Sequence, residues 1–144
     1  MTNNGAKVYI TQEALMRDVD SNRLKPRFDL SSAAEYGELV HLAGHGNVAM
    51  MMGAIGKTVI DGLWDFDCER DFILGTGDLT VAIGVGVVLA LLNVPYFRLL
   101  RWDKKTKGYA IIRHDIEELE RYIDEKQTKE EIKEIAHGEK IAND

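Results

Sequence analysis

The sequence predicts an α/β fold: a single small domain with a mixed sheet, a central buried helix and C-terminal helices. Strand-like and helix-like patterns alternate through residues 38–102, which is typical of strands joined by helices. A short apolar segment at residues 72–74 leads through a glycine turn into an apolar helix pattern at residues 79–92. Residues 96–113 contain two strand patterns around a charged loop, which predicts a final hairpin.

The stretch from Asp71 to Asn93 is the most apolar and most sharply delimited part of the chain. Gly75 and Gly77 can adopt positive φ angles, which lets the backbone turn directly after a strand. Asp78 is a favourable N-cap because its carboxylate accepts hydrogen bonds from the first free N–H groups of a helix. The fourteen residues from Leu79 to Leu92 carry no charge, yet a helix that spans a bilayer needs about 20. We therefore expect a helix that is buried on most sides.

The remaining elements follow from local patterns: apolar alternation for strands, 3.6-residue spacing for helices and polar clusters for loops. In chain order they are a strand at 7–10, an irregular loop or short helix at 11–27, a helical turn at 32–35, a strand at 38–43, a loop at 44–47, a helix at 48–66, an acidic turn at 65–71, strands at 96–102 and 109–113, and helices after Asp115 with a break near Gln127. No repeat or linker divides the chain. Residues 1–144 are therefore expected to form one domain, with 113–144 as a helical extension.

Composition narrows the classes of function. The net charge is −6, which argues against a general nucleic-acid binder because such proteins usually carry excess positive charge. Cys68 is the one cysteine of the sequence, so no intrachain disulfide can form and a reducing compartment is expected. The first ten residues lack the charged and apolar regions of a secretory signal. We therefore expect a cytoplasmic protein that does not associate with membranes.

Three segments together resemble a group of small proteins of tailed bacteriophages: residues 32–40 (SAAEYGELV), 73–90 (ILGTGDLTVAIGVGVVLA) and 98–109 (RLLRWDKKTKGY). Members of that group combine an aromatic-Gly-Glu strand, a strand ending in Gly-Asp, a helix of small residues and a Leu-Lys/Arg-Trp-Asp hairpin. The resemblance covers about residues 28–113. Many members have proline after Gly-Asp, where this chain has Leu79. The resemblance implies a phage origin, and hence the host cytoplasm as the location, but no particular activity.

The glycine turn is the first candidate ligand site and consists of Gly75, Thr76, Gly77 and Asp78. A helix N-terminus offers free N–H groups and a partial positive charge, which suit a phosphate. Ligands of α/β sheets also commonly bind at the carboxyl ends of strands. Two observations favour a purely structural turn instead. Asp78 would repel an anion, and the motif is shorter than a dinucleotide fingerprint.

Two further segments could close over a ligand at this turn. His45 and Asn47 lie in the predicted loop after the second strand, and loops often carry function. Arg98, Arg101 and Trp102 lie in the predicted hairpin, beside several lysines. Arginine and aromatic side chains together can stack on a base and hold a phosphate. The alternative for the hairpin is an ordinary solvated surface.

No nucleophile–base pair, metal-ligand set or cofactor motif is specified, so the sequence favours a protein without catalytic residues, metal or cofactor. The first hypothesis is binding of a small phosphorylated, nucleotide-type ligand by an oligomeric phage protein that sequesters a host defence signal. A second hypothesis is inhibition of a host protein by direct binding. A third is a small metal-dependent phosphohydrolase, because the run of carboxylates at residues 61–71 could hold Mg²⁺. The long apolar helix and its row of small residues predict a homo-oligomer, with a dimer as the commonest case.

Overall fold

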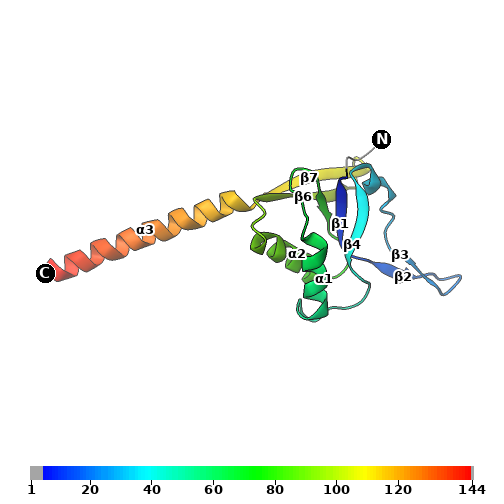
Figure 1. Ribbon diagram of the computed structural model, residues 1–144, viewed down its shortest axis with the longest axis horizontal. Helices are drawn as coiled ribbons and strands as arrows, with labels where there is room; N and C mark the ends of the chain where they lie inside the picture. Colours follow the sequence, from blue (N-terminus) through cyan, green and yellow to red (C-terminus); the bar gives the residue numbers. More distant parts are fainter. Residues whose placement is uncertain (1–4, 144) are drawn as a thin grey trace. The chain divides into compact units, whose positions relative to one another are not determined.

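The computed structural model describes residues 5–143, so residues 1–4 and Asp144, which belong to the single domain expected from the sequence, lie outside it. The elements are β1 Lys7–Gln12, β2 Leu15–Arg17, β3 Leu24–Pro26, the 3₁₀ helix η1 Ser31–Glu35, β4 Glu38–Ala43, α1 Ala54–Leu63, β5 Phe72–Leu74, α2 Leu79–Leu91, β6 Tyr96–Asp103, β7 Gly108–Asp115 and α3 Ile116–Asn143 (Figure 1). The chain divides into two compact units, one ending at His114 and the other beginning at Asp115. The first unit contains both sheets, and the second consists of α3.

A five-stranded mixed sheet with the order β4-β1-β5-β6-β7 forms the centre of the first unit. β1 pairs in parallel with β4 and β5, and β5 pairs in parallel with β6. The four-residue connection between β6 and β7 makes this last pair a hairpin, since parallel strands need a long crossover. The chain thus passes from β1 to β4 on one side, and then crosses over β1 to reach β5 on the other side. The order of the sheet reverses at β1.

Both faces of the sheet are covered. On one face, Tyr9 and Ile73 pack against buried side chains of α1 and α2, including Val59 and Val85. On the other face, Val8, Ile10, Phe72, Leu74 and Leu100 pack against η1 through Ala33, with Leu30 and Tyr36 at the edge of this cluster. Strands that are buried on both faces have nearly continuous apolar sequences, which explains the all-buried pattern of β5 and of most of β1.

The α/β class, the mixed sheet and most elements agree with the sequence analysis, but the region at 11–27 was predicted wrongly. It forms a two-stranded antiparallel hairpin, β2–β3, in which Leu15 lies opposite Pro26. Two of the three residues of β2 and all three of β3 are exposed, so neither strand needs an apolar face. Their sequences, Leu-Met-Arg and Leu-Lys-Pro, accordingly show no apolar alternation that could have predicted a strand. The hairpin is instead held at its base by the Arg27 N–H, which donates to the Ala14 carbonyl at 2.9 Å.

Two predicted helix boundaries were also wrong. The helix expected from residue 48 begins at Ala54, after Gly53 with a φ of 66°, a conformation that glycine adopts without steric cost. The break expected near Gln127 is absent, and α3 is continuous over 28 residues. Its first turn is capped as predicted, since the Glu118 N–H donates to Asp115 Oδ1 at 2.9 Å. Within the part of the chain that is described, no helix has both the length and the apolar character needed to cross a membrane.

Candidate functional site

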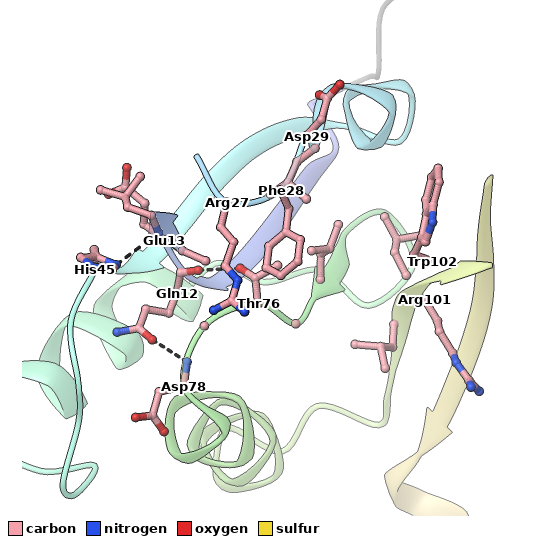
Figure 2. Close-up of a pocket in the computed structure, with 18 of the residues that line it drawn as sticks. Gln12, Glu13, Arg27, Phe28, Asp29, His45, Thr76, Asp78, Arg101 and Trp102 are labelled. Carbon is pink, nitrogen blue, oxygen red and sulfur yellow. Dashed lines mark hydrogen bonds between the residues drawn. The ribbon is translucent and has the colours of Figure 1, made fainter. Parts of the chain in front are cut away.

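A cavity of about 1060 Å³ lies at the carboxyl ends of β1, β5 and β6 (Figure 2). Its wall includes the residues that follow β1, the glycine turn after β5, the loop after β4 and the segment after β3. Because the strand order reverses at β1, the carboxyl ends of β1 and β5 form the topological switch point of the sheet. In open α/β sheets, ligands bind in the crevice at such a point.

The glycine turn is held in place by the end of β1. Thr11 Oγ1 donates to the Thr76 carbonyl at 2.7 Å and accepts from the Thr76 N–H at 3.0 Å. Thr76 Oγ1 in turn donates to the Gln12 carbonyl. These three bonds join residues that lie 64 or 65 positions apart, so the floor of the cavity is preorganised.

Gln12 connects three segments of the cavity wall. Its side chain is buried, with 2% exposed. Gln12 Nε2 donates to the carbonyls of Gly44 and Gly46 at 2.9 and 2.6 Å. Gln12 Oε1 accepts from the Asp78 N–H at 2.6 Å. One side chain therefore fixes the loop after β4 to the start of α2.

Asp78 acts as the predicted N-cap, and its carboxylate also reaches the loop after β4. Asp78 Oδ1 accepts from the Thr80 N–H at 2.8 Å, and Oδ2 accepts from the Val48 N–H at 3.2 Å. These hydrogen bonds, the one from Thr80 first, lower the pKa of Asp78 below its ordinary value. The carboxylate is therefore ionised at neutral pH and engaged within the chain.

Gly77 occupies a position in the turn where a larger side chain would not fit. Its φ is +83°, and a Cβ at this position would clash with the side-chain atoms Oε1 and Cβ of Gln12. The Gln12 side chain also accepts a hydrogen bond from the Asp78 N–H, and the Asp78 carboxylate accepts one from the Thr80 N–H. These two side chains therefore occupy the space at the N-terminus of α2. A phosphate was predicted to bind at this helix N-terminus, but the N–H groups of Asp78 and Thr80 already have partners within the chain.

Aromatic side chains line the other walls. Phe28 and Trp102 are each about half exposed, and Trp102 meets Tyr109 edge-on at a centroid distance of 5.2 Å. Phe28 comes from the segment after β3 and Trp102 from β6, so the two rings approach the cavity from different elements (Figure 2). Burial raises the pKa of Tyr109 above its ordinary value.

The charged groups of the wall are of both signs. Arg27 extends toward the glycine turn, whereas Arg101 points away from Trp102 at the rim (Figure 2). Glu13 and Asp29 add two carboxylates to the lining, whereas the carboxylate of Asp78 is already held by the Thr80 and Val48 N–H groups. The lining therefore suits a ligand that combines an anionic group with hydroxyl or amino donors, rather than an anion alone.

Eight of the nine predicted site residues meet in this cavity: Gly75, Thr76, Gly77, Asp78, His45, Asn47, Arg101 and Trp102. His45 also braces the β2–β3 hairpin, since its Nδ1 accepts from the Leu15 N–H at 3.2 Å. Arg98 lies elsewhere. Its guanidinium carbon lies 4.1 Å from the centre of the Phe72 ring, and its Nη2 donates to the Glu69 carbonyl at 2.8 Å, before β5 begins.

Sequence analysis missed Gln12, Glu13, Arg27 and Phe28 as residues of the cavity. The sequence contained a signal for Gln12 and Glu13, which lie two and three residues after the apolar strand pattern at 7–10. That position places them at the carboxyl end of a strand. Arg27 and Phe28 carry no such signal, because the hairpin that positions them has no apolar alternation.

The described residues include no group of three or more His, Cys, Asp or Glu side chains that could hold a metal ion. In the acidic run, Asp61, Asp65 and Asp67 are exposed. Asp71 is fully buried at the amino end of the sheet, where it pairs with Arg70 at 3.0 Å and accepts from the Lys7 N–H at 2.9 Å. The run thus contributes a structural ion pair at the end of the sheet opposite the cavity.

Comparison with known protein families gives a match over residues 6–116 to the family model described as phage Pam3 gp32-like protein. The chain belongs to the phage Pam3 gp32-like family. The resemblance to phage proteins seen in the sequence is thereby confirmed, and the family match extends it to β1. No curated protein and no solved structure matches the chain. The family match includes every residue that lines the cavity.

Proposed function

We propose that this phage protein binds a small, phosphorylated, nucleotide-type molecule in the cavity at the carboxyl ends of β1, β5 and β6, without converting it. The observation that carries the proposal is the position of the cavity. It lies at the topological switch point and is lined by eight residues that the sequence indicates independently. Its volume of about 1060 Å³ is ample for such a ligand.

The chemistry of the lining supports this class of ligand. A base stacked on an aromatic ring gains about 1–3 kcal/mol, and Phe28, Trp102 and Tyr109 are available. Arg27 can bind a phosphate beside the turn, because a guanidinium matches phosphate geometry with paired donors. Carboxylates such as Glu13 and Asp29 can accept hydrogen bonds from sugar hydroxyls or base amino groups.

Membership in a phage family gives such binding a use. A protein that holds a nucleotide signal of the host without consuming it lowers the free concentration of that signal. We therefore propose sequestration of a host defence signal as the biological role, and it rests on the phage origin together with the binding proposal. Self-association of the protein is part of the same proposal.

The test is a thermal-shift screen of the purified chain with mono-, di- and cyclic dinucleotides, with inorganic phosphate and nucleosides as references, followed by titration calorimetry. We expect a rise in melting temperature with at least one nucleotide in the absence of added metal, and recovery of that nucleotide intact. Formation of a product in the presence of Mg²⁺ would contradict the non-catalytic proposal. The absence of any shift would contradict the ligand class and favour direct binding to a host protein.

Variants locate the site. We expect Arg27→Gln to weaken binding roughly tenfold or more, because hydrogen bonds to charged groups contribute about 1.5–3 kcal/mol. Trp102→Ala should weaken it by a similar factor through lost stacking. Arg23→Gln, in the same hairpin region but outside the cavity lining, is the matched control and should bind normally. Equal affinities for all three variants would place the ligand elsewhere.

Binding should also weaken as ionic strength rises, since exposed charges are screened within about 10 Å at 0.1 M salt.

A further inference from the structure

We infer that the outer face of α2, formed by Leu79, Ile83, Gly86, Val87, Ala90 and Leu91, is a two-fold interface between two copies of this chain. The starting observation is the unusual composition of α2. Of its thirteen residues, Thr80 alone has a polar side chain, and none is charged. One side packs on the sheet through Val81, Val85, Val88 and Leu89, all buried.

The other side of α2 is exposed. Leu79, Ile83, Val87 and Leu91 have exposed fractions of 71%, 60%, 53% and 75%. Single exposed aliphatic residues are ordinary, but these four lie one turn apart along one helix and therefore form a contiguous patch. A surface helix normally carries polar residues opposite its buried stripe, and a helix that is apolar all round is normally buried all round. We therefore expect another surface to cover the outer face of α2.

The outer face of α2 is complementary to itself. Leu79, Ile83, Val87 and Leu91 form an i±4 ridge of large side chains, and the adjacent i±4 row consists of Ala82, Gly86 and Ala90. A Cβ on Gly86 would have no atom within 4 Å, so this row is open. Ridges along i±4 rows pack into the i±4 grooves of a facing helix at a crossing angle of about −50°. Because ridge and groove lie side by side on one surface, a two-fold axis places each ridge in the groove of the other copy.

The size and chemistry of the outer face of α2 favour a second copy over other occupants. Two such faces together present on the order of 1,000 Å² of apolar surface, which reaches the lower limit for a specific interface. Homodimer interfaces are more apolar than transient ones between different proteins. The face has no charge with which to recognise a polar partner. It also lacks the Lys and Arg residues of helices that lie on membrane surfaces.

The test measures the mass of the full chain by light scattering at micromolar concentration. We expect twice the chain mass of 16.2 kDa. Val87→Glu and Ile83→Glu should each reduce it to 16.2 kDa, because two buried carboxylates would face each other across the axis. Both positions are exposed in the single chain, so circular dichroism should show unchanged helix content. Val19→Glu, at a position that is 94% exposed in the β2–β3 hairpin, is the matched control and should remain dimeric.

A wild-type mass of 16.2 kDa would overturn the inference. A dimer that persists in both glutamate variants would also overturn it, because association would then use another surface. The result does not depend on whether the cavity binds a nucleotide, since Ile83 and Val87 do not line the cavity. A nucleotide titration of monomeric Val87→Glu reports separately on that site.

Discussion

At the residue scale, the two glycines of the turn after β5 have different roles. The sequence offers Gly75 and Gly77 as equivalent turn residues, but the structure separates them. Gly77 has a φ of +83° and lies against the Gln12 side chain, whereas a Cβ on Gly75 would have no atom within 4 Å. Gly77 is thus needed for its conformation and its close packing. Gly75 lines the cavity without either constraint.

We predict that Gly77→Ala destabilises the protein by about 1 kcal/mol or more, because alanine resists positive φ and its Cβ would displace Gln12. Gly75→Ala should change stability by only a few tenths of a kcal/mol. The free energy of unfolding in urea, followed by circular dichroism, measures both. Equal losses in the two variants would show that the Gln12 contact is unimportant.

At the element scale, Gln12 joins the end of β1, the loop after β4 and the start of α2. Its partners are backbone groups of Gly44, Gly46 and Asp78, none of which is near Gln12 in sequence. The caps of α2 and α3 are local in contrast, because Asp78 and Asp115 accept hydrogen bonds from N–H groups two and three residues further along the chain. Local caps fix where helices begin, and Gln12 fixes how one helix is placed.

We predict that Gln12→Leu lowers the free energy of unfolding by about 1–3 kcal/mol, because it leaves a donor and two carbonyls without their partner. Amide hydrogen exchange at Asp78 and in the loop at 44–47 should accelerate more than exchange in the middle of β1. Gln127→Leu, on exposed α3, is the matched control and should have little effect on stability. The prediction fails if the two variants unfold at the same urea concentration.

At the scale of the whole molecule, the first unit contains its own core. Among the described residues, the two hydrophobic clusters are formed between Val8 and Tyr109. The family match covers the same part of the chain and ends at residue 116, where α3 begins.

We predict that a chain of residues 1–116 folds, unfolds cooperatively in urea and keeps the melting temperature of the full chain within a few degrees. The reason is that the apolar burial that drives folding lies within the retained part. Differential scanning calorimetry of the two chains measures this. A broad, non-cooperative transition in the shorter chain would contradict the prediction.

Local patterns in the sequence predicted most of the individual elements of this protein. The bounds of β4 and β5, the cap at Asp78 and the apolar run of α2 were all predicted, because periodicity, capping and glycine turns act over a few residues. The break near Gln127 was a wrong prediction. That prediction rested on Thr128 and Glu131, which have the spacing of a capping box. The neighbouring Lys and Glu residues favour helix, and the helix continues.

Which distant segments meet depends on the order of the strands in the folded sheet. The strand order β4-β1-β5 brings Gln12 to Asp78 and the loop at His45 to the glycine turn. It also places Arg98 beside Glu69 and Phe72, away from the cavity, although Arg101 lies three residues further on. A hairpin without apolar alternation supplies Arg27 and Phe28 to the wall. These arrangements depend on burial and on hydrogen bonds between residues 29 to 66 positions apart, and no short-range pattern encodes them.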